Sequence, residues 1–133
     1  MARRHLAIFV NGMAEKILSG EKRVDVRLSQ SRIPPYLALQ KEDEILLKSS
    51  GGKIIGKASI DNCLFYDKLI PSQVKEIQNN YGSAAMGDEK FWESKRSAKF
   101  ATIIFLKNPR KFLTPVLYKK NDRRAWVVLE EEV

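Results

Sequence analysis

The chain has few of the residues that build redox, zinc or hydrolytic centres. Its 133 residues include one cysteine, Cys63, and one histidine, His5. A lone cysteine cannot form an internal disulfide, which favours a reducing cytoplasm, and one Cys with one His is too few for a Cys/His zinc site. We expect His5 to be a surface or strand residue, and we expect no Ser-His-Asp triad. The carboxylates are dispersed, so we expect no metal and no cofactor.

Long hydrophobic runs, repeats and low-complexity segments are also missing. The apolar run that ends before Asn11 is too short for a signal peptide with its cleavage site, and far too short to span a bilayer. The hydrophobic content of 44% is typical of a globular core. We therefore expect one soluble, cytoplasmic domain over residues 1–133, with no membrane contact.

The glycine-rich stretch 51–57 predicts a hairpin rather than a phosphate-binding loop. Gly51, Gly56 and Lys57 have the P-loop spacing, but Ala58 stands where Ser or Thr is required. Ser and Gly at 49–52 are typical of a turn between two strands.

Hydrophobic periodicity predicts about six strands and two or three short helices. The strands are expected at 5–9, 24–28, 45–47, 53–60, 100–106 and 126–129, and the helices at 11–19, 71–81 and after Asp88. We expect Gly82 to end the second helix. Strands and helices do not alternate, which argues against a doubly wound sheet. The sequence therefore predicts an α+β fold, a small barrel with helices at its mouth.

Positive charge is concentrated in residues 99–124, the basic segment. The formal net charge of the whole chain is +8, and this segment alone holds eight Lys or Arg against one acidic residue. Interleaved aromatic residues complete a pattern typical of a surface that contacts nucleic-acid phosphates. A solvated face, or a site for an acidic protein partner, remains an alternative. The candidate phosphate contacts are Lys119, Lys120, Arg123 and Arg124.

The octet 20–27 joins a helix to a strand. After Gly20 the spacing of apolar residues changes from the helical period of 3.6 to the strand period of 2. This change places Arg23, Asp25 and Arg27 on one strand face and Lys22 at the start of the strand. Residues two apart on a strand face are about 6.5 to 7 Å apart, so Asp25 can reach Arg23 or Arg27, or accept a hydrogen bond from Lys22. The alternative is a solvated row of ion pairs that adds little stability.

This octet resembles the signature of the ASCH domain family, Gly-x-Lys-x-x-Glu-x-Arg. Gly20, Lys22 and Arg27 match the pattern, and Asp25 stands where Glu is usual. The resemblance implies a PUA-like barrel over most of the chain and a ligand cleft lined by Lys22, Arg23, Asp25 and Arg27. It also implies that the chain binds RNA or a nucleotide-like small molecule.

The resemblance leaves an enzymatic alternative open. Some bacterial ASCH proteins that share the Gly-x-Lys turn are amidohydrolases acting on N4-acetylcytidine, and others are reported as ribonucleases. By that analogy Lys22 is the nucleophile or base, with Asp25 as the second catalytic residue. Lys22 would have to be neutral, which burial and nearby cations favour and the Asp25 carboxylate opposes. The amidohydrolases carry Thr at the position of Asp25, and their Glu stays unassigned among Glu76, Glu89 and Glu93.

Overall fold

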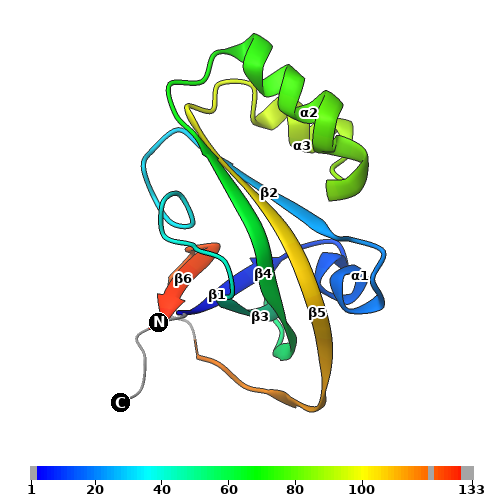
Figure 1. The fold of residues 1–133 in the computed structure, drawn as a ribbon. Helices are drawn as coiled ribbons and strands as arrows, with labels where there is room; N and C mark the ends of the chain where they lie inside the picture. Colours follow the sequence, from blue (N-terminus) through cyan, green and yellow to red (C-terminus); the bar gives the residue numbers. More distant parts are fainter. Residues whose placement is uncertain (1–2, 120–121, 130–133) are drawn as a thin grey trace.

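The computed structural model of the chain describes residues 3–119 and 122–129 (Figure 1). Its elements are β1 (Arg4–Phe9), α1 (Met13–Ser19), β2 (Val24–Ser29), β3 (Glu44–Ser49), β4 (Ile54–Tyr66), α2 (Pro71–Ala85), α3 (Glu89–Ser94), β5 (Phe100–Val116) and β6 (Trp126–Leu129). None of the helices in these ranges has the length and apolar character needed to cross a membrane.

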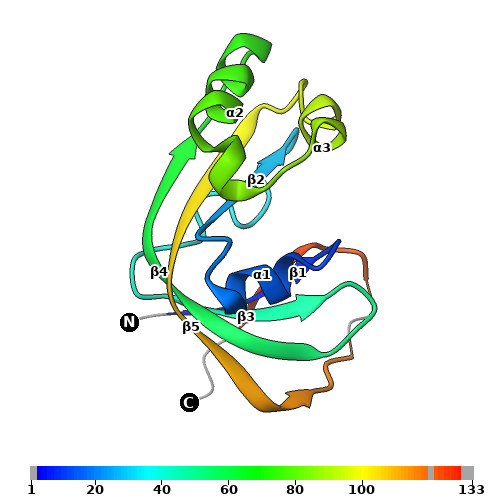
Figure 2. The same ribbon diagram turned by 90° about the vertical axis from the view of Figure 1, so that its right-hand side faces the viewer.

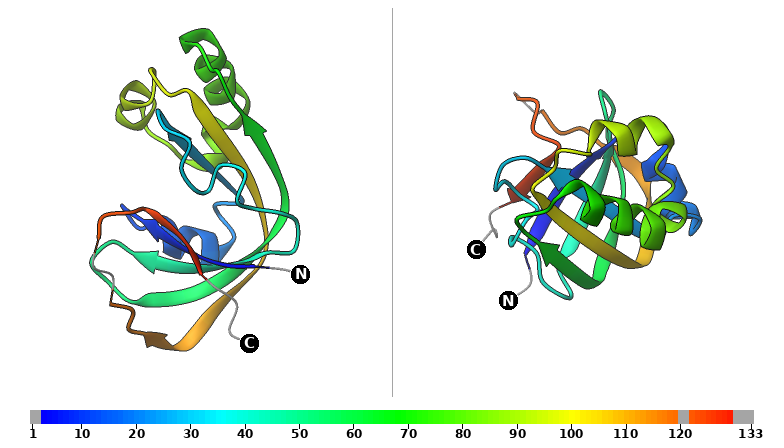
Figure 3. Two further views of the ribbon diagram at one scale, coloured as in Figure 1. Left: turned by 90° about the vertical axis from the view of Figure 1, so that its left-hand side faces the viewer. Right: turned by 90° about the horizontal axis from the view of Figure 1, so that it is seen from above.

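The six strands form one sheet in the order β2-β5-β4-β3-β1-β6. β1 and β3 are parallel, and every other neighbouring pair is antiparallel. The long strands β4 and β5 bend, so that the sheet curls into a half-barrel with β2 near one end and β6 at the other (Figures 2 and 3). This confirms the predicted α+β fold, a small barrel of about six strands with three helices.

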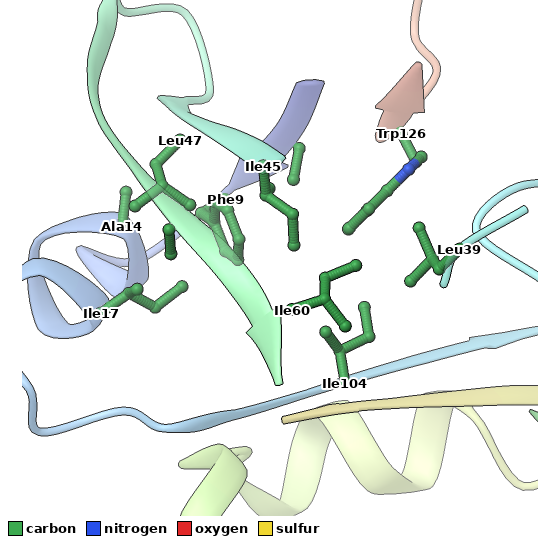
Figure 4. Packing of buried hydrophobic residues seen from close by; sticks show 11 residues of the cluster. Phe9, Ala14, Ile17, Leu39, Ile45, Leu47, Ile60, Ile104 and Trp126 are labelled. Carbon is green, nitrogen blue, oxygen red and sulfur yellow. The ribbon is translucent and has the colours of Figure 1, made fainter. Parts of the chain in front are cut away.

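The main core lies inside the curl, where α1 packs against the sheet (Figure 2). Figure 4 shows Ile17 of α1, Ile60 of β4 and Trp126 of β6 converging on it. Trp126, the first residue of the strand predicted at 126–129, is buried in this core. As predicted, α1 buries one face and ends at Gly20, whose φ of 86° places it in the left-handed region. The helix begins at Met13, two residues later than predicted, and Gly12 precedes it.

A second core lies between the α2 and α3 helices and the β2–β5 part of the sheet. Val74, Ile77 and Trp92 from the helices meet Val26 and Ile103 from the strands. Pro71 opens α2 and Asp88 caps α3 by accepting a hydrogen bond from the Phe91 amide, both as the sequence predicts.

The α2 helix is longer than the sequence predicts. It passes through Gly82 and ends at Ala85, and Met86 takes the left-handed cap conformation with φ of 60°. A Cβ at Gly82 would lie 3.6 Å from Trp92 Nε1, an ordinary contact distance, so the space around this glycine does not require its small size. The expectation that Gly82 ends the helix was therefore wrong, because a glycine inside a helix costs only about 1 kcal/mol relative to alanine and α2 continues until Ala85 is buried in the second core.

The strands β4 and β5 are also longer than predicted. β4 runs beyond the predicted end at residue 60 to Tyr66, and β5 runs ten residues beyond the predicted end at Leu106 to Val116. Three register shifts along the β4–β5 pair accompany this length. Such irregularities bend a strand, which is how one pair serves both ends of the half-barrel.

Candidate functional site

A cleft of about 890 Å³ lies between the two ends of the half-barrel. Its volume is in the usual range for small-molecule sites. Phe9, Tyr36, Phe91, Phe100 and Trp126 make much of its wall aromatic. Its lining comprises residues 8–11, Met13, Lys22, 25–29, 33–36, 85–88, Phe91, Lys95, Phe100, Thr102 and 124–126.

Lys22 is buried in the wall of this cleft, with 4% of its surface exposed. Its ammonium donates a hydrogen bond to the Ala85 carbonyl at the end of α2 and lies 3.5 Å from Asp25 Oδ1. The last carbonyls of a helix lack partners within the helix and carry the negative end of its dipole, so they suit a cation. Sequence reasoning missed Ala85, because a backbone carbonyl leaves no side-chain signal and the predicted helix ended too early.

Burial and ion pairing set the charges of Lys22 and Asp25. Burial lowers the pKa of Lys22, and Arg27 adds to this, while Asp25 opposes it without restoring the ordinary value. Burial alone would raise the pKa of Asp25, but the Arg27 and Lys22 cations outweigh it and hold that pKa below its usual range. The carboxylate is therefore ionised between two cations.

Arg27 spans the open side of the half-barrel. Its Nε donates to Asp25 Oδ2 at 2.7 Å, and its Nη2 donates to the Ile8 carbonyl of β1 at 3.2 Å. The guanidinium also lies over the rings of Phe9 and Trp126, at 4.8 and 5.2 Å from their centroids. Arg27 thus links β2 to β1 and β6, two strands that are not neighbours of β2 in the strand order.

Behind Trp126 lies a buried polar network that the sequence did not reveal. Trp126 Nε1 donates to His5 Nδ1 at 3.1 Å, and His5 Nε2 lies 2.8 Å from Asp43 Oδ2. Because Nδ1 accepts, the ring is neutral with its proton on Nε2. Burial lowers the pKa of His5 despite the Asp43 carboxylate. His5 lies on the predicted strand but is fully buried rather than at the surface, because its two hydrogen bonds compensate for burial.

The structure brings Lys22, Asp25 and Arg27 together but leaves Arg23 apart. Arg23 is exposed, donates to the Gly20 carbonyl at 3.4 Å and does not line the cleft. It precedes β2 and belongs to the turn that follows Gly20.

The candidate phosphate-binding residues occupy two settings. Lys119 and Arg123 are exposed, whereas Arg124 reaches the edge of the cleft and pairs with Asp122 at 2.8 Å. Lys120 lies outside the described residues. Within the described ranges, no group of three or more His, Cys, Asp or Glu is placed to hold a metal ion.

Comparison with known proteins identifies the fold. No protein-family model and no curated protein matches this sequence. The crystal structure of ASCH from Zymomonas mobilis is 18% identical and matches with a TM-score of 0.74 over 97% of this chain and 89% of that one. Two single-substitution variants of the same protein match with TM-scores of 0.76 and 0.74, also at 18% identity. The chain therefore has the same fold as this ASCH protein.

Proposed function

We propose that this chain is an ASCH-type domain that binds RNA or a nucleotide-derived ligand and holds one nucleobase in the cleft. The observation that carries the proposal is a buried cation, Lys22, in the wall of a cavity that also presents five aromatic side chains. Nucleobases are flat and uncharged, and guanine, cytosine and uracil carry a carbonyl group, so they can stack on aromatic walls and accept a hydrogen bond there. The fold shared with ASCH from Zymomonas mobilis supports this choice.

Lys22 is the proposed donor to the base. An ammonium has three donors, and contacts to Ala85 and Asp25 engage two of them, which leaves one for a carbonyl on the ligand. Tyr36 and Phe100, whose centroids are 4.9 Å apart, supply the stacking surface. Asp25 and Arg27 act by holding Lys22 in place.

Phosphate contacts are assigned to the surface outside the cleft. The inner site has two cations, Lys22 and Arg27, and one anion, Asp25, so its charge suits a base better than a phosphate chain. The exposed Lys119 and Arg123, with Lys120, are the proposed backbone contacts. Arg124 lies at the edge of the cleft and joins the two parts of the site.

Binding of short single-stranded RNA, measured by fluorescence anisotropy across a salt series, tests this proposal. Lys22→Met keeps the apolar stem and removes the donor, so affinity should fall about tenfold or more at every salt concentration. Arg23→Met removes a neighbouring charge outside the cleft and should change affinity less than about twofold. Equal affinity of Lys22→Met and wild type would exclude the cleft, and no binding by wild type would exclude an RNA ligand.

The lowered pKa of Lys22 favours a second candidate, a small hydrolase. A neutral Lys22 amine can act as base or nucleophile on N4-acetylcytidine or a similar acylated nucleoside, or on RNA as a ribonuclease, with Asp25 beside it. Chromatography would detect cytidine released from N4-acetylcytidine, or RNA fragments. The rate should rise with pH as the amine loses its proton, and Lys22→Arg should abolish it. An absence of product with both substrates would contradict this candidate.

A further inference from the structure

A continuous set of contacts runs from the core to the cleft behind the residues that would face a ligand. The Asp43 carboxylate accepts from the backbone amides of Arg3 and Gln40, at 2.9 and 3.1 Å, as well as contacting His5. These bonds fix the carboxylate, which fixes the His5 ring, and the ring accepts the Trp126 N–H. His5 and Asp43 are both 0% exposed, so neither can touch a ligand.

We propose that Asp43, His5 and Trp126 form a positioning relay that holds Arg27, and through it Asp25, in place at the cleft. Trp126 is the last member, because its ring lies beneath the Arg27 guanidinium while its N–H is held by His5. The inference deepens the proposed function, and its binding measurement rests on that function. The positioning itself can be measured without a ligand.

The other tryptophan shows that core packing alone does not require such a network. Trp92 is as buried as Trp126, each 3% exposed, yet its Nε1 has no hydrogen-bond partner among the described residues. Burying an imidazole and a carboxylate is costly compared with apolar groups of similar volume, even when they are paired. The chain buries this polar pair behind Trp126, the tryptophan that contacts Arg27, and not behind Trp92.

Protonation of His5 should disconnect the relay. A second proton would sit on Nδ1 and face the Trp126 N–H, so two donors would meet where one hydrogen bond now lies. The charged groups acting on His5 are Asp43, which favours the proton, and Arg3, which opposes it. Cys63 of β4 lies near the same Asp43. Trp126, and with it Arg27, would then lose its fixed position.

Trp126→Phe and Trp92→Phe form a matched pair of variants. Both remove an indole N–H from the interior, but only the first removes a hydrogen bond. NMR of the Arg27 Nε–H group should show hydrogen exchange at least tenfold faster in Trp126→Phe, and RNA affinity should fall about five- to tenfold. Trp92→Phe should change each quantity less than about twofold.

A pH titration separates positioning from general stability. In the wild-type protein the Arg27 Nε–H chemical shift should change together with the protonation of the His5 ring. His5→Gln offers an amide that can donate to Asp43 and accept from Trp126 without titrating, so it should keep the neutral-pH shift and lose the pH dependence. This variant also tests the relay if Trp126→Phe does not fold.

The outcomes distinguish the two proposals. The relay would be overturned if the Arg27 Nε–H group exchanged at the same rate in Trp126→Phe and Trp92→Phe. It would also be overturned if the Arg27 Nε–H chemical shift kept its wild-type pH dependence in His5→Gln. If the Arg27 signal responds as expected but wild type binds neither RNA nor nucleosides, the relay holds and the proposed function is wrong. If RNA binds and Arg27 does not respond, the proposed function holds and the relay is wrong.

Discussion

The charges of the cleft and those of the basic segment share their chemistry and differ in their setting. Lys22 and Asp25 are 4% and 7% exposed and lie within a paired row, whereas Lys119 and Arg123 face water. Ionic interactions are strong away from water and are screened by salt at the surface. We infer that the buried row holds a fixed geometry, while the surface charges are suited to attracting a polyanion from solution.

The largest effect is expected when the buried row of Lys22, Asp25 and Arg27 loses its anion, Asp25. Asp25→Ala leaves Lys22 and Arg27 as close, partly desolvated cations, so the free energy of unfolding should fall by about 3 to 5 kcal/mol. Urea denaturation followed by circular dichroism measures this loss. Asp67→Ala is the control, because Asp67 is exposed and its removal should cost no more than about 0.5 kcal/mol. Equal losses in the two variants would show that the row behaves like surface charge.

The next effect is the response of stability to acid. The pKa of His5 is lower in the folded chain than its ordinary value of 6.5, so between these two values the unfolded chain binds a proton that the native chain does not. Stability should therefore rise with pH in that window and be lost as pH falls, by at most about 1.4 kcal/mol per pH unit for one proton. Urea unfolding at a series of pH values from 5 to 7 measures this dependence. The unfolding free energy of His5→Gln should change less steeply with pH than that of wild type. An identical slope in the two proteins would contradict this account.

Local sequence signals predicted the elements that present the cleft. The change from helical to strand period after Gly20 located α1 and β2, and Asp88 marked the start of α3. These elements depend on residues that are close together in the sequence, so the spacing of residues was enough to predict them. Spacing also brought Asp25 and Arg27 together, because residues two apart share a strand face.

The remaining parts of the site depend on contacts between distant segments. His5, Asp43 and Trp126 meet because β1 pairs with β3, which Asp43 precedes, and with β6, and no local pattern reports these pairings. The Ala85 carbonyl reaches Lys22 because α2 continues past Gly82 to Ala85, which is buried in the second core. The residue pattern also left open a solvated row of ion pairs on β2, whereas Asp25 is buried and lines the cleft.

A smaller effect on stability, but a clear one on binding, is expected in the basic segment. Lys119→Glu combined with Arg123→Glu should weaken single-stranded RNA binding about tenfold and reduce the salt slope by about 1.4, because each phosphate that is no longer neutralised lowers the slope by about 0.7. Unfolding free energy should change by no more than about 0.5 kcal/mol. The control is Lys75→Glu combined with Arg96→Glu, which makes the same charge change on α2 and beside α3. Its salt slope for RNA binding should stay closer to that of wild type. Equal slopes in the two double variants would show that net charge alone drives binding.

The smallest effect is expected at Arg23, the neighbour of Lys22. The resemblance to ASCH domains implies that Arg23 lines the ligand cleft, whereas its side chain is exposed and bonded to the Gly20 carbonyl outside the cleft lining. Arg23→Ala should therefore change the unfolding free energy by no more than about 0.5 kcal/mol and RNA affinity by less than about twofold. Urea denaturation and anisotropy at one salt concentration measure both. A loss of affinity as large as that of Lys22→Met would extend the binding surface from the cleft onto the turn after α1, and the division between buried and exposed charges would no longer separate base from phosphate contacts.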